Sequence, residues 1–212
     1  MHIEPGMLDQ FKILGANVAA IGVLAAHAPA LLKRPTLWLR TALAAVFFSL
    51  FMQAFHMKVG PSELHFVGAM PIYLLLGFVP TLFGFAIGLL LQGLLFEPQD
   101  LVHLAVNTLS LVVPLIALHH TLGKRLKASL SVPTILKLDA AYYAGVTAMV
   151  GFWLMNGVGE TALADWARFA ASYLSIVALE PLFTVLIVSG VHAVRHAAWA
   201  RTCFDERVTA AT

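Results

Sequence analysis

Residues 101–122 read LVHLAVNTLSLVVPLIALHHTL, a run of 22 residues without Lys, Arg, Asp or Glu. A helix crosses the hydrocarbon core of a bilayer with about 20 mostly apolar residues, so this stretch is long enough to span a membrane. The whole chain has the same character, because 60% of its 212 residues are hydrophobic and only 11% are charged. Its mean hydropathy is +0.86. Since soluble domains normally carry charge on about a quarter of their residues, the composition excludes a soluble protein and indicates an integral membrane protein.

The sequence divides into seven apolar segments, each expected to be a membrane-spanning helix. They are Phe11–Leu32, Leu37–Phe55, Leu64–Phe78, Thr81–Phe96, Leu101–Leu122, Leu136–Leu154 and Phe169–Val194. The third and fourth are short and are joined only by Val79-Pro80, so a count of six with one broken or re-entrant segment is the alternative. We predict an all-α polytopic membrane protein, a bundle of about seven transmembrane helices that forms a single integral membrane domain over residues 1–212.

Positive charge predicts the orientation of the bundle, because cytoplasmic loops collect Lys and Arg. With the amino terminus outside and the carboxy terminus inside, ten of the 13 Lys and Arg residues fall on the cytoplasmic side. Residues 195–212 are then a short cytoplasmic tail at the inner (plasma) membrane. The outer side carries only three cations and has seven carboxylates: Glu4, Asp9, Glu63, Glu97, Asp100, Glu160 and Asp165. This outer surface favours cations, although membrane insertion alone would also account for the asymmetry.

Residues 1–10 are expected to lie at the outer surface and to bind a metal ion. No basic region of a signal peptide precedes the first apolar run, so the chain is expected to keep Met1 at its terminus. The Met1 amine, the His2 amide nitrogen and the His2 imidazole can chelate one ion in a plane, which suits Ni²⁺, Cu²⁺ and, less readily, Co²⁺. The plain alternative is that His2 is an ordinary residue on a frayed terminus.

A fourth nitrogen can come from a histidine on the same side of the membrane. On the predicted topology three histidines lie near the outer surface: His56, His65 and His103. His65 is the best candidate because residues 60–65, GPSELH, are typical of a turn that leads directly into the third span. A lone histidine at a membrane interface is also commonly a polar anchor, and His56 or His103 could assist.

The sequence resembles the CbiM/NikM family, the substrate-capturing membrane subunits of cobalt and nickel energy-coupling-factor (ECF) transporters. The resemblance rests on Met1-His2-Ile3 followed by Pro5-Gly6, and on residues 60–68, GPSELHFVG, which are similar to the family segment Gly-Thr-Ser-x-His-Leu-x-Gly. Residues 92–96, QGLLF, and Asn107 give further similarity. The chain departs from the family pattern because two residues, not one, separate Ser62 from His65, and because Pro61 replaces a threonine.

The resemblance implies a seven-span subunit that holds Co²⁺ or Ni²⁺ through the Met1 amine, the His2 backbone and imidazole nitrogens, and His65. It also implies partners: a transmembrane coupling subunit, a pair of ABC ATPases and often a small accessory membrane subunit. The CbiM branch and its link to cobalamin synthesis favour cobalt. The chain has no G-x-x-x-x-G-K-[ST] motif, so ATP hydrolysis is expected on other subunits. We expect a transporter component without catalytic residues or a prosthetic group, and no nucleic-acid partner.

Other residues leave two alternatives open. Glu180 is predicted deep in the bilayer, where it could serve a proton relay or cation site, or could be hydrogen-bonded inside the bundle to Gln92 or Asn107. A membrane-embedded metal- or haem-dependent enzyme or redox protein using His27, His103 or Glu180 is the alternative function. The first span also repeats small residues every four positions, which would fit either a partner subunit or packing within the chain. These are Gly15, Ala16, Ala19, Ala20, Gly22, Ala26 and Ala30.

Overall fold

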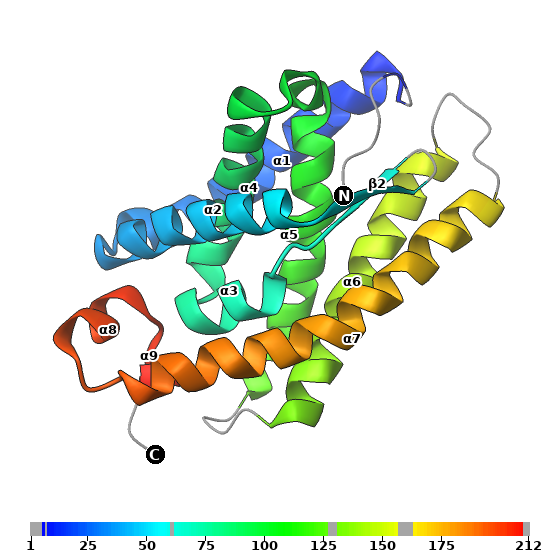
Figure 1. Ribbon diagram of the computed structural model, residues 1–212. Helices are drawn as coiled ribbons and strands as arrows, with labels where there is room; N and C mark the ends of the chain where they lie inside the picture. Colours follow the sequence, from blue (N-terminus) through cyan, green and yellow to red (C-terminus); the bar gives the residue numbers. More distant parts are fainter. Residues whose placement is uncertain (1–5, 7, 60–61, 127–130, 157–162, 210–212) are drawn as a thin grey trace.

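The computed structural model describes residues 6, 8–59, 62–126, 131–156 and 163–209, and most of them are helical (Figure 1). The long helices are α1 (Gln10–Leu32), α2 (Thr36–Ala54), α4 (Phe78–Leu95), α5 (Leu104–Thr121), α6 (Val132–Met155) and α7 (Leu163–Ala193). The short elements are β1 (His56–Val59), β2 (Ser62–His65), α3 (Ala69–Leu76), the 3-10 helices η1 (Pro98–His103) and η2 (Gly123–Arg125), α8 (Ala198–Cys203) and α9 (Glu206–Thr209).

Five helical stretches in the described part of the chain are long and apolar enough to cross a membrane. They are Gln10–Leu32, Thr36–Ala54, Phe78–Leu95, Pro98–Thr121 and Trp166–Ala193. Each overlaps a predicted span, so the expectation of an all-α membrane protein is confirmed. Helix α6 covers the sixth predicted segment with 24 residues but is not one of the five. The count of seven spans and the side on which each terminus lies stay predictions.

The third predicted span, Leu64–Phe78, is wrong as a single helix. Its first two residues end strand β2, and the helix that follows, α3, has only eight residues. At 1.5 Å per residue α3 is about 12 Å long, well short of the roughly 30 Å of a bilayer core. Gly68 precedes the helix and Gly77 follows it, both with positive φ, 62° and 92°. These two left-handed positions limit the helix to two turns.

Helix α3 lies inside the bundle, between α2 and α7 in Figure 1, and also contacts α4, α6 and α9. All eight of its side chains are buried. Irregular backbone at membrane depth is tolerated where protein surrounds it, and α3 with its two glycines meets that condition. The segment is therefore a buried, broken element of the kind that the six-span alternative anticipates.

Helices α2 and α4 pack closely because small residues face each other. A Cβ at Gly84 would overlap the Cβ of Ala44, and a Cβ at Gly88 would overlap the ring of Phe48. Close backbone approach between small residues is the usual way that helices associate in membranes. In α1, by contrast, only Ala16 and Ala20 of the small-residue repeat are buried, so packing within the chain accounts for that pair alone.

Candidate metal site

Strands β1 and β2 form an antiparallel hairpin between α2 and α3. The register pairs His56 with His65 and Lys58 with Glu63. The residues between the strands, Gly60 and Pro61, lie outside the described part of the chain. The hairpin was not expected from the sequence, because Ser62-Glu63-Leu64-His65 has no regular alternation of polar and apolar residues.

His65 is the last residue of β2 and does not lie in the first turn of a helix, as was predicted for the span Leu64–Phe78. Its side chain is nevertheless buried, with 4% of its surface exposed. Glu63 lies two residues earlier and therefore on the same face of the strand. The Nε2 atom of His65 is 3.5 Å from Oε2 of Glu63, and the ring centroids of His65 and His56 are 6.0 Å apart. The hairpin thus gathers two imidazoles and a carboxylate.

The connection from α4 to η1 adds two more acidic residues to this corner. Burial raises the pKa of Glu97, and the negative charges of Asp100 and Glu63 raise it further, whereas His56 lowers it. These interactions show that Glu63 and His56 of the hairpin lie close to Glu97 and Asp100. Neighbouring carboxylates create a negative potential, which favours the approach of a cation. His103, at the end of η1, is also buried.

Two of the three predicted ligands cannot be placed, because Met1 and His2 lie outside the described part of the chain. Within that part no group of three or more His, Cys, Asp or Glu residues is arranged to hold a metal ion. The described residues therefore bring His65 to an acidic corner with His56 but do not complete a coordination sphere there.

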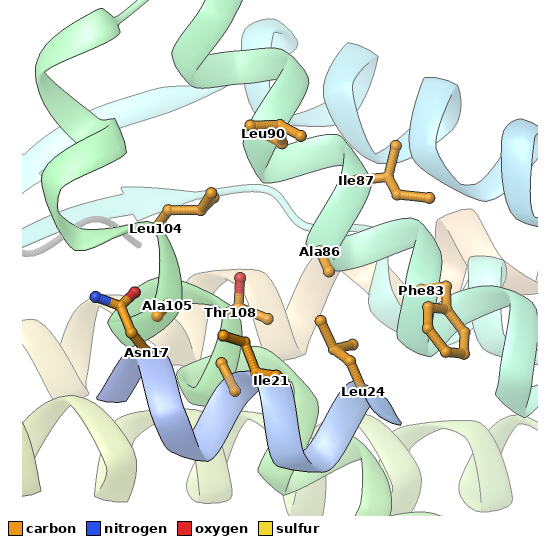
Figure 2. A pocket seen from close by; sticks show the side chains of 11 residues that line it. Asn17, Ile21, Leu24, Phe83, Ala86, Ile87, Leu90, Leu104, Ala105 and Thr108 are labelled. Carbon is orange, nitrogen blue, oxygen red and sulfur yellow. The ribbon is translucent and has the colours of Figure 1, made fainter. Parts of the chain in front are cut away.

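The crevice in Figure 2 is apolar, unlike the acidic corner beside His65. It has a volume of about 290 Å³, lies between α1, α4 and α5, and is lined almost entirely by apolar side chains such as Ile21, Leu24 and Phe83. Asn17 and Thr108 supply the only polar side chains of its lining. Since a metal ion needs nitrogen, sulfur or charged oxygen ligands, this crevice does not suit one.

Glu180 is fully buried in α7, as its predicted depth implies, but its predicted partners are wrong. Its Oε1 accepts a hydrogen bond from the backbone N–H of Met70 at 2.9 Å, and its Oε2 accepts one from the hydroxyl of Tyr143. Gln92 instead donates to the Ser49 carbonyl and accepts from Gln53, both at 2.7 Å.

Asp139 of α6 is a second fully buried acid beside Glu180, and the sequence reading missed it. Its position inside a predicted span, close to the start of Leu136–Leu154, was the signal that could have found it, because an intramembrane carboxylate is costly. His27, proposed for an enzyme site, has its Nδ1 2.8 Å from the carbonyl of Val23, one turn earlier in its own helix.

Comparison with known proteins decides the family. The sequence profile described as "Cobalt uptake substrate-specific transmembrane region", CbiM, matches residues 2–198. The chain belongs to the CbiM family. Residues 199–212, which include most of α8 and all of α9, lie beyond the match. No curated protein matches this CbiM chain.

Two solved structures share the fold of this CbiM protein. A "transition metal transporter" has a TM-score of 0.69 at 19% identity, with 94% of this chain and 96% of the other covered. A "truncated transition metal transporter" has a TM-score of 0.70 at 19% identity, with 92% and 99% covered. At this identity the likeness shows the fold alone. With its apolar helices, the CbiM chain is a multi-pass protein of the cell membrane and a membrane component of cobalt or transition-metal uptake.

Proposed function

We propose that this chain is the substrate-binding component of an ECF-type transporter and that it captures Co²⁺, or Ni²⁺, for ATP-driven uptake. The observation that carries the proposal is the CbiM match over residues 2–198. We assign the metal ligands to the Met1 amine, the His2 amide and imidazole nitrogens, and His65. The metal is the cargo, and ATP is hydrolysed on separate ABC subunits that act through a transmembrane coupling subunit, in some systems with a small accessory membrane subunit.

The hairpin supports the role of His65. A metal-ligating imidazole is usually oriented by a carboxylate or carbonyl at its other ring nitrogen. Glu63 is a carboxylate 3.5 Å from the Nε2 of His65, so it is placed to hold the imidazole in one orientation. The acidic corner formed with Glu97 and Asp100 would draw a divalent cation towards the imidazole.

The proposed mechanism follows from the ligands. A planar set of four nitrogens releases its ion slowly, so delivery needs energy from the partner subunits or a movement that separates His65 from Met1 and His2. Cobalt is our preferred ion because of the CbiM membership, and nickel is the second choice because planar nitrogen ligation suits it.

Substitution of the hairpin histidines tests this function. We expect His65→Asn to lower the Co²⁺ affinity of the purified protein by about 100-fold or more, because a ligand is lost. His56→Asn is the matched control, since His56 pairs with His65 across the hairpin but is exposed. Equilibrium dialysis of both variants measures the difference. Wild-type affinity in His65→Asn, or an equal loss in both variants, would contradict the assignment.

A further inference from the structure

The two buried carboxyls Asp139 and Glu180 lie apart from the proposed metal ligands and have no role in capture as described above. Asp139 belongs to α6 and Glu180 to α7, and both are fully buried. The two side chains are close enough to interact electrostatically. Glu180 accepts hydrogen bonds from Met70 N–H and from the Tyr143 hydroxyl. The carboxyl of Asp139 receives no such N–H or O–H bond from the described residues, and its interaction is with the carboxyl of Glu180, which a proton between them allows.

Among the described residues, the surroundings of the pair supply hydroxyls and a helix end, and no cation is paired with either carboxyl. Helix α6 contributes Tyr142 and Tyr143, and α7 contributes Tyr173. Helix α3 contributes the backbone N–H of Met70. No ion pair within the described ranges includes Asp139 or Glu180. Two carboxylates without a counter-charge cannot both be ionised in a low-dielectric interior, so the pair has to hold a proton.

Within the described residues, Tyr173 adds an unpartnered buried hydroxyl to the surroundings of the pair. Its hydroxyl is buried, has no hydrogen-bond partner within the described residues and interacts with Glu180. Its ring stacks on that of Tyr143 with the centroids 5.1 Å apart. A buried hydroxyl without a partner is unusual, because most buried polar groups are hydrogen-bonded.

We propose that Asp139 and Glu180 form a proton-binding site that holds one exchangeable proton and latches α3 to α7. Glu180 is the carboxylate, because it accepts two hydrogen bonds and one of them comes from the amino-terminal turn of a helix. Asp139 carries the proton. When the proton leaves the Asp139 carboxyl and binds Glu180, the negative charge passes to Asp139, the total charge of the pair is unchanged, and the bond from Met70 N–H weakens.

The latch acts on the segment that follows His65. Met70 is five residues beyond His65, and Phe66 between them packs edge-on against Phe183 of α7 with the ring centroids 5.5 Å apart. Helix α7 thus holds this segment at two points, Glu180 and Phe183. The link from the proton to metal capture rests on the proposed function of His65, whereas the proton site itself does not.

Infrared spectroscopy of metal-free protein tests the proton site. The wild type is expected to show the C=O band of a protonated carboxyl at neutral pH, with a shift in D₂O. Asp139→Asn should lose a component of this band. Asp9→Asn, the matched control, should not, because hydrogen bonds from Lys12 lower the pKa of the partly exposed Asp9. Absence of the band from the wild type, or an unchanged band in Asp139→Asn, would overturn the proposal.

Hydrogen exchange tests the latch in the same metal-free protein. Glu180→Gln, which keeps the side-chain size, should make the peptide containing Met70 exchange about tenfold faster, because a bond to a charged acceptor is replaced by a weaker one. Unchanged exchange would overturn the latch. Both the infrared and the hydrogen-exchange measurements are made without metal, so their results do not depend on the Co²⁺ affinity of His65→Asn. Failure of the proposed function is therefore distinguishable from failure of this proposal.

Discussion

At the scale of single residues, Gly68 matters because it joins the strand of His65 to helix α3. It has a φ of 62°, which a residue with a Cβ adopts only with strain, and a Cβ there would overlap the ring of Phe51. No other residue type therefore fits this turn without displacing Phe51. The backbone at Gly68 fixes the direction in which the chain leaves His65.

We expect Gly68→Ala to reduce the free energy of unfolding by about 3 kcal/mol, from the left-handed backbone and the overlap with Phe51 together. Gly22→Ala in α1 is the control, because nothing lies within 4 Å of its Cβ position. That variant should be unchanged or slightly more stable, since alanine favours a helix. Unfolding of both variants in detergent measures the contrast. Equal stabilities would contradict the assigned backbone geometry.

Glu97 predicts a pH dependence at the acidic corner. Its folded-state pKa is raised above its ordinary value of 4.5 by burial and by the neighbouring carboxylates. The folded protein therefore binds this proton more tightly than the unfolded chain does. The resulting stability is present below the ordinary pKa and is lost as the pH rises through the raised pKa.

Thermal unfolding of metal-free protein, measured from below pH 4.5 to above the raised pKa of Glu97, tests this dependence. Glu97→Gln should flatten the fall in stability with rising pH, because the amide does not titrate. A wild-type slope that persists in full in Glu97→Gln would show that other groups cause it.

At the scale of elements, the sequence predicted the long helices well. The prediction failed for the segment whose apolar side chains are buried against protein and do not face lipid. The predicted segments Phe11–Leu32 and Leu37–Phe55 agree with α1 and α2 within one residue at each end. A long apolar run bounded by polar residues is most stable in a bilayer as a membrane-spanning helix, so its bounds can be predicted from hydropathy. Segment Leu64–Phe78 is equally apolar, but its apolar residues face protein. Hydropathy does not distinguish these two environments.

The contacts of the carboxy-terminal elements were also not predicted from the sequence. The tail was expected to be only a short basic end, yet it folds back on α3. The backbone N–H of Asp205 donates to the Leu75 carbonyl at 2.6 Å, and Arg207 donates to the Tyr73 carbonyl at 3.3 Å. The Arg207 guanidinium also lies 4.9 Å from the centre of the Tyr73 ring. The tail therefore supplies a donor to the Leu75 carbonyl at the end of α3, and a second donor to the Tyr73 carbonyl, which also accepts from the Gly77 N–H.

Arg207→Ala should lower the stability by about 2 kcal/mol, through the loss of a charged hydrogen bond and of the contact with the Tyr73 ring. Arg201→Ala is the matched control, because the Arg201 side chain is exposed and only its carbonyl is used, by Arg40. Unfolding midpoints in detergent and protease sensitivity of the tail measure both effects. If the two variants behave alike, the docking of the tail by Arg207 is wrong.

At the scale of the whole molecule, the sequence predicted the membrane class and the CbiM family, and both are confirmed. It also selected His65, which is buried beside Glu63 at the acidic corner. It missed Asp139 and misassigned the partners of Glu180, because such contacts depend on how α3, α6 and α7 pack together. That arrangement is a tertiary property, and no spacing along one segment encodes it.

The predicted orientation can be tested with the single cysteine of the chain, Cys203, in α8. With the carboxy terminus inside, a membrane-impermeant thiol reagent should label Cys203 only after the cells are permeabilised. A second variant, Cys203→Ser with Gln99→Cys, carries its thiol at the exposed start of η1. It should be labelled in intact cells, and the reverse pattern would contradict the orientation.

The most direct test of metal capture is the Co²⁺ affinity of protein purified with a free Met1 amine, compared with the same protein carrying one added alanine before Met1. The addition moves the terminal amine out of the chelate and leaves every other residue unchanged. We expect one Co²⁺ or Ni²⁺ per chain in the first protein and an affinity lower by about 100-fold or more in the second. Equal metal affinity in the two proteins would contradict the proposed site.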